Sequence, residues 1–135
     1  MKQYNIFISH SWAYGDGYEK LVKLLEADSR FNFKNYSVPK NDPIHNAPSQ
    51  AQLAAAIQNQ MRFCDVIIIL AGVYSTYSKW INKEIEIAQN FTTPKPILAI
   101  EPWASEKTSS IVKNNADKIV KWNTRSIVDG IRELS

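Results

Sequence analysis

The sequence predicts an α/β protein with a parallel sheet that helices cover on both faces. The clearest observation is Val66–Leu70, five consecutive apolar residues, because a strand buried on both faces has no polar side. A second run, Ile6, Phe7 and Ile8, stands near the start of the chain. Stretches with apolar residues at helical spacing separate the runs, and this alternation of strand and helix is typical of a parallel sheet.

The elements follow one another in order along the chain. We expect strands at residues 4–9, 33–38, 66–70, 96–100 and 118–122. We expect helices at 17–27, at 49–65, from 79 onward and at 126–134, with one short helix within 103–115. Ser49 with Gln52 forms a capping box for the second helix, and Ser126 with Asp129 is expected to cap the last one. Three prolines mark residues 39–48 as a loop.

Five strands in this order predict a flavodoxin-like arrangement, three layers α/β/α with a five-stranded parallel sheet of order 2-1-3-4-5. The length of 135 residues suits a single domain over residues 1–135. Ligands of such sheets bind beyond the carboxyl ends of the strands, where the strand order reverses. That place lies between the first and third strands, so the site is expected after residues 8 and 70.

Composition and charge exclude several classes of function. No apolar run approaches the roughly 20 residues that span a bilayer, and the chain does not start with a signal peptide, so no membrane partner is expected. The single cysteine, Cys64, excludes an internal disulfide and fits a reducing compartment, which predicts a cytoplasmic protein. A net charge of +3 with dispersed lysines does not by itself indicate a nucleic-acid partner.

One carboxylate in the helix after residue 79 projects from the apolar side. The neighbours of Glu84 three and four residues away are all apolar, namely Trp80, Ile81, Ile87 and Ala88. Glu86 lies instead among polar residues on the opposite face. A carboxylate on an apolar face has to be paired, neutralised or used in chemistry. Since this helix follows the third strand, the topology places Glu84 beside the predicted crevice.

Two common occupants of such crevices lack their residues here. A phospho-accepting receiver domain needs an aspartate at the end of the third strand, where Ala71 and Gly72 stand. A dinucleotide fingerprint needs a third glycine after Gly15 and Gly17, but Lys20 takes that place, and no Walker loop is present. The sequence therefore predicts no resident cofactor.

Metal and nucleophile chemistry have little support either. His10, His45 and Cys64 lie on three different elements without ligand spacing, so no metal site is expected. Ser9, His10 and Ser11 supply the residue types of a nucleophile and a base, but adjacent residues seldom face each other, and no nucleophile elbow is present.

Two motifs carry a family resemblance. Residues 4–11 read YNIFISHS and residues 78–85 read SKWINKEI. The first resembles the opening box of Toll/interleukin-1 receptor (TIR) domains, a strand that ends in Phe-Ile-Ser-Tyr/His-Ser. The second is similar to the Ser-x-Trp-Cys-x-x-Glu-Leu segment of plant and bacterial TIR enzymes, with Ile81 in place of the cysteine. The compact chain looks most like the TIR-like subfamily of the bacterial Thoeris antiphage protein ThsB.

The resemblance implies an activity. TIR enzymes use the glutamate of the second motif to cleave the nicotinamide–ribose bond of NAD, which would make Glu84 catalytic and NAD a substrate. Relatives in Thoeris systems make an ADP-ribose-derived signal, cyclic or conjugated, that activates a partner effector protein. Residues 39–48 stand where the family has its BB loop, without the usual hydrophobic-arginine tip, and imply a homo-oligomer.

Several residues are expected to contact the substrate. Trp80, with Trp12 or Tyr74, is expected to stack on nicotinamide or adenine. The candidates for hydrogen bonds to ribose or phosphate are Ser9, His10, Ser11 and Ser75.

Structural alternatives stay open for these residues. Glu84 is alternatively a structural carboxylate paired with Arg62 or a lysine, and Trp80 a core residue. The serines alternatively end strands or cap helices. For the whole protein, the alternatives are a non-catalytic TIR module that signals by self-association through residues 39–48 and, with weaker support from the basic isoelectric point, nucleic-acid processing.

Overall fold

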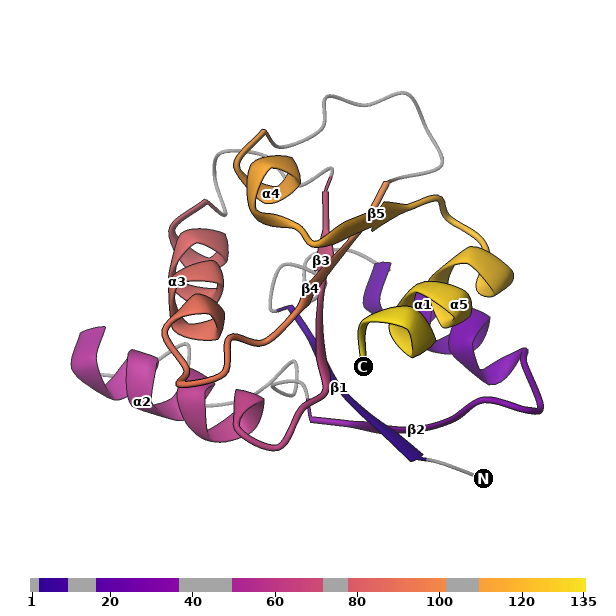
Figure 1. The fold of residues 1–135 in the computed structure, drawn as a ribbon, viewed down its shortest axis with the longest axis horizontal. Helices are drawn as coiled ribbons and strands as arrows, with labels where there is room; N and C mark the ends of the chain where they lie inside the picture. The colour runs from indigo at the N-terminus through magenta and orange to yellow at the C-terminus, as the bar shows by residue number, and fades with distance from the viewer. Residues whose placement is uncertain (1–2, 10–16, 37–49, 72–77, 102–109) are drawn as a thin grey trace.

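The computed structural model describes residues 3–9, 17–36, 50–71, 78–101 and 110–135, along which strands and helices alternate (Figure 1). The strands are β1 (Gln3–Ile8), β2 (Asn32–Asn35), β3 (Val66–Leu70), β4 (Ile97–Ile100) and β5 (Lys118–Val120). The helices are α1 (Gly17–Glu26), α2 (Gln50–Met61), α3 (Ser78–Gln89), α4 (Ser110–Asn115) and α5 (Thr124–Leu134). Within these ranges no helix combines the length and hydropathy that crossing a membrane requires.

All five strands run parallel in the order β2-β1-β3-β4-β5. Ile6 of β1 lies opposite Val66 of β3, and Ile67 of β3 lies opposite Ile97 of β4. This order confirms the predicted flavodoxin-like α/β class. Because the strand order reverses between β1 and β3, the ends of these two strands mark the expected place for a ligand.

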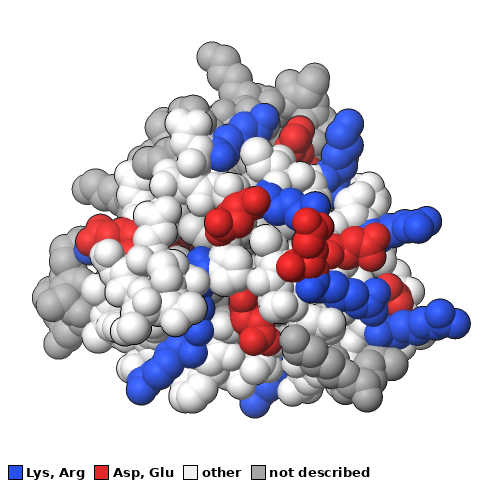
Figure 2. All heavy atoms as spheres, viewed as in Figure 1, with Lys and Arg blue, Asp and Glu red and all other residues white. Residues whose placement is uncertain are grey.

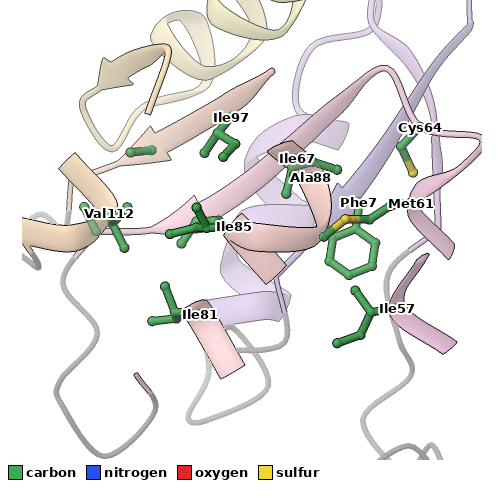
Figure 3. Packing of buried hydrophobic residues seen from close by; sticks show 13 residues of the cluster. Phe7, Ile57, Met61, Cys64, Ile67, Ile81, Ile85, Ala88, Ile97 and Val112 are labelled. Atoms are coloured by element: carbon green, nitrogen blue, oxygen red, sulfur yellow. The ribbon is translucent and has the colours of Figure 1, made fainter. Parts of the chain in front are cut away.

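Two buried clusters lie on opposite faces of the sheet, since successive strand residues point to opposite sides. Phe7 and Ile67 belong to the cluster covered by α2, α3 and α4, whereas Ile6 and Ile68 belong to the cluster covered by α1 and α5. Figure 1 shows α2 and α3 on the left of the sheet and α1 and α5 on the right. Figure 3 shows the first cluster, with Ile85 of α3 among its residues. The helix that carries Glu84 is therefore packed on the same face as Phe7.

Two aspartates join neighbouring strands at the edge where the strands begin. The Asn5 amide donates to Asp65 Oδ2 at 2.9 Å, and the Asp65 amide donates to the Asn5 carbonyl at 2.6 Å. Asp117 and Ile97 make the same reciprocal pair, with both distances 2.8 Å. Each aspartate comes just before a strand, so its carboxylate satisfies an amide of the neighbouring strand and fixes the pairing there.

The last helix begins earlier than predicted. Asn123 is its N-cap, and the Asn123 side chain accepts a hydrogen bond from the Ser126 amide. The predicted cap by Ser126 and Asp129 is therefore wrong. Asparagine caps a helix as well as serine does, and here it stands three residues nearer the start of the chain.

Other element ends differ by a few residues. α2 ends at Met61, not near residue 65, because the Cys64 amide bonds to the Met61 carbonyl three residues back and closes the helix with a tighter turn. β5 ends at Val120, before the predicted residue 122. β2 ends at Asn35, although the Tyr36 amide still donates to the Ile6 carbonyl.

Candidate active site

Glu84 lies on the inner side of α3, where the sequence places it. Its side chain is 0% exposed, between Ile81 and Ala88, which are buried in the cluster beneath the helix. Glu86, two residues further along, is exposed. The contrast follows from helical periodicity, because residues three and four apart share a face whereas residues two apart do not. Of these two carboxylates, Glu84 alone is taken out of water.

Ser9 lies opposite Glu84, immediately after β1. Its amide donates to the Ile68 carbonyl at 2.8 Å and so extends the pairing of β1 with β3 by one residue. Because strand residues alternate, Ser9 falls on the same face as Phe7, the face that α3 covers. The Ser9 hydroxyl donates a hydrogen bond of 2.7 Å to Glu84 Oε1, and Ser9 is 1% exposed. Two segments 75 residues apart thus meet through this pair.

The hydrogen bond between Ser9 and Glu84 has the ordinary length of a bond with an O–H donor, and both of its partners are buried. Removing one partner of a buried hydrogen bond generally costs about 1–3 kcal/mol, because the other partner stays desolvated. The pair therefore compensates in part for burying the carboxylate and restricts its orientation.

Two more residues stand at the same edge of the sheet. The Ala71 amide, just after β3, donates to the Ile100 carbonyl, and the Glu101 amide, just after β4, donates to the Val120 carbonyl. By strand alternation Ala71 and Glu101 fall on the face of Ala99, which α3 and α4 cover. Ala71 is a small, fully buried residue, and Glu101, which no sequence motif singled out, places a second carboxylate at this edge. The signal for Glu101 was the alternation of Ile97, Ala99 and Glu101.

The structure describes only part of the predicted site. It brings together Glu84 and Ser9, as described above, and places Trp80 within the first turn of α3. The remaining predicted contacts with the substrate lie outside the described residues; they are His10, Ser11, Trp12, Tyr74 and Ser75. The loop 39–48 also lies outside them.

The structure bears on one of the alternatives for Glu84 and describes where possible metal ligands lie. Arg62 donates to Asn59 Oδ1 at 2.7 Å and stacks over Phe63, so the suggested pair of Arg62 with Glu84 is wrong. Across the described part of the chain, no three histidine, cysteine, aspartate or glutamate side chains converge as metal ligands would.

Two open grooves of the described surface lie away from Glu84. One, of about 260 Å³, lies along the outer side of α3 and is lined by Glu86 with Asn82 and Gln89 among others. Another, of about 530 Å³, lies between the end of α1 and α5. Basic and acidic side chains are interspersed on the face that Figure 2 shows, so the described residues of that face form no continuous basic surface.

Comparison with known proteins gives one family. The sequence model of the Thoeris protein ThsB, TIR-like domain, matches residues 7–107, a stretch that includes both Ser9 and Glu84. No curated protein matches the chain at a significant level.

Two solved structures are similar to the chain. One is the CMP N-glycosidase BcmB of Clostridium botulinum, at 14% identity and a TM-score of 0.48, over 96% of this chain and 98% of that one. The other is CapF with the inhibitor 3-isopropenyl-tropolone, at 16% identity and a TM-score of 0.43, over 87% of this chain and 30% of that one.

Proposed function

The chain belongs to the TIR-like domain family of the Thoeris protein ThsB, and on that premise we propose that it is an NAD-consuming enzyme of bacterial antiphage defence. It cleaves the nicotinamide–ribose bond and makes an ADP-ribose-derived signal, cyclic or conjugated, that activates an effector protein. The observation that carries the proposal is the buried carboxylate of Glu84, which meets the end of β1 where the strand order reverses.

The chemistry needs little more than a positioned negative charge. The bond between C1′ of the ribose and the nicotinamide nitrogen breaks, and both electrons go to the positively charged ring, which leaves neutral. The ribose then carries oxocarbenium character, which a carboxylate at the sugar stabilises as in glycoside hydrolysis. Water attacking C1′ and losing a proton gives ADP-ribose, whereas attack by another nucleophile gives a cyclic or conjugated product.

Glu84 suits the role of that carboxylate. In a site without water, its charge interacts with the developing positive charge far more strongly than it would in solution. Its 0% exposure also sets a requirement: NAD reaches the carboxylate only after a local rearrangement around α3 and the end of β1.

The proposal is tested in cells that express the protein during phage infection. NAD and its products are measured by mass spectrometry in cells with the wild-type chain, Glu84→Gln or Glu86→Gln. We expect NAD loss and a new ADP-ribose-derived species with the wild type and Glu86→Gln, and neither with Glu84→Gln. Equal NAD loss and equal product in all three strains contradict the assignment of Glu84.

One observation favours a second function, that of a non-catalytic module that signals by self-association. A carboxylate with no exposed surface and a serine partner also fits a purely structural role. In that case Glu84→Gln retains both antiphage protection and the oligomeric state of the wild type, and NAD does not raise the melting temperature of the protein.

A further inference from the structure

We propose that Ser9 is a positioning residue that holds the carboxylate of Glu84 in its reactive orientation, and does not itself bind the substrate. This inference rests on the proposed function. It concerns one contact, the hydrogen bond of 2.7 Å from the Ser9 hydroxyl to Glu84 Oε1.

Ser9 is well fixed for this role by its own backbone. Its amide bonds to the Ile68 carbonyl of the central strand at 2.8 Å, and the preceding residue, Ile8, lies opposite Ile68 in the sheet. A side chain on a paired strand has a more precise position than one on a free loop. The hydroxyl therefore holds Glu84 against the sheet, independently of the packing of α3 itself.

The single proton of the hydroxyl favours positioning of Glu84 over donation to the substrate. A serine hydroxyl has one hydrogen to donate, and here Glu84 Oε1 accepts it. A sugar oxygen that accepted the Ser9 proton would take this hydrogen bond away from Glu84 Oε1.

Loss of the hydroxyl has two expected consequences at Glu84. The carboxylate gains freedom to rotate about its terminal bond, and small errors in the position of a catalytic group cost up to about 100-fold in rate. The side chain of Glu84 also loses one of the contacts that hold it against the end of β1. Both effects act on the chemical step, since neither removes a contact with bound NAD.

The test compares Ser9→Ala, Ser9→Thr, Glu84→Gln and Glu86→Gln for nicotinamide release from NAD, in the purified protein and in phage-infected cells. We expect Ser9→Ala to lower kcat on the order of 10- to 100-fold, with KM within about twofold of wild type. Ser9→Thr keeps the hydroxyl, so it is expected to recover most of that loss. Thermal unfolding shows whether each variant is folded at the assay temperature.

The outcomes separate this inference from the function on which it rests. If Glu84→Gln abolishes release but folded Ser9→Ala keeps the wild-type kcat, the positioning role is wrong and the proposed function stands. If Ser9→Ala raises KM and leaves kcat unchanged, Ser9 binds the substrate instead. If Glu84→Gln releases nicotinamide as fast as Glu86→Gln, or the wild type releases none in either setting, the proposed function is wrong. The positioning role of Ser9, which rests on it, is then wrong as well. If Ser9→Thr does not fold, the kcat and KM of Ser9→Ala still distinguish a positioning role from substrate binding.

Discussion

Two glutamates of α3 share a chemical group and differ in everything around it. Glu84 is enclosed between helix and sheet with the Ser9 hydroxyl on one oxygen, whereas Glu86 is solvated on the outer side. A buried carboxylate is costly unless it is hydrogen-bonded, so such a residue is often retained for its chemistry. This difference makes Glu86→Gln the matched control for Glu84→Gln: the same atoms change in the same helix, in another environment.

A prediction at the residue scale concerns Cys64. Burial raises the pKa of its thiol from 9.0 to about 12, the nearby Lys95 lowers it in part, and Asp65 adds to the rise. Since only the thiolate is reactive, we expect almost no alkylation of native protein at pH 8 and one equivalent after unfolding in urea. Mass spectrometry of the labelled protein checks this, and rapid labelling of the native chain would contradict it.

The same thiol affects stability at high pH. Its pKa in the folded protein, about 12, lies above the ordinary value of 9.0, so burial of the neutral thiol contributes fully only below about pH 9. That contribution is expected to be lost as the pH rises from about 9 towards 12. Urea unfolding at increasing pH is expected to show a smaller decline for Cys64→Ala than for the wild type.

At the scale of elements, periodicity predicted most of what the structure has. The consecutive apolar residues of β3 required burial on both sides, and β3 is indeed central. The ends of the elements were harder to predict, because neighbouring residues can each cap the same helix. Asn123 and Ser126 are both good N-caps, and only the three-dimensional contact of the Asn123 side chain with the Ser126 amide decides between them.

The aspartates that precede β3 and β5 give a prediction about the sheet. We expect Asp65→Ala and Asp117→Ala each to lower the free energy of unfolding by about 1–3 kcal/mol, because each leaves a partly buried strand amide without its acceptor. Asp129→Ala is the control: that side chain is 61% exposed, its pair with Arg125 is long at 3.9 Å, and a change below about 1 kcal/mol is expected. Urea denaturation measures all three, and equal effects would contradict the role of the reciprocal pairs.

α5 packs closely on the sheet at Gly130. A Cβ at this position would lie 3.0 Å from Leu98 Cδ1 and 3.2 Å from Val120 Cγ1, both side-chain atoms of the neighbouring strands. We therefore expect Gly130→Val to overpack the interface and to destabilise the protein by about 1–3 kcal/mol. Asp129→Val places the same β-branched residue on the exposed side of the helix. Valine has a higher helix propensity than glycine, so a melting temperature of Gly130→Val that is no lower than that of Asp129→Val would contradict the overpacking.

At the scale of the whole molecule, the topology places the candidate site. β1 and β3 leave the sheet where the strand order reverses, and the helix after β3 returns to cover the end of β1. The sequence predicted this place and predicted Glu84 within it, because a helical stripe and a strand order are regular patterns. It did not predict the hydrogen bond to Ser9, since that contact joins residues 75 apart and depends on the exact register of helix against sheet.

The central claim, that the Glu84 carboxylate cleaves NAD, is tested most directly by steady-state release of nicotinamide from NAD by purified protein. The measurement compares Glu84→Gln with Glu86→Gln at equal concentration, after thermal unfolding has shown both to be folded. We predict that Glu86→Gln keeps the wild-type rate and that Glu84→Gln loses at least about 100-fold, the range found when a group that stabilises a transition-state charge is removed. Equal rates in the two variants would contradict the claim.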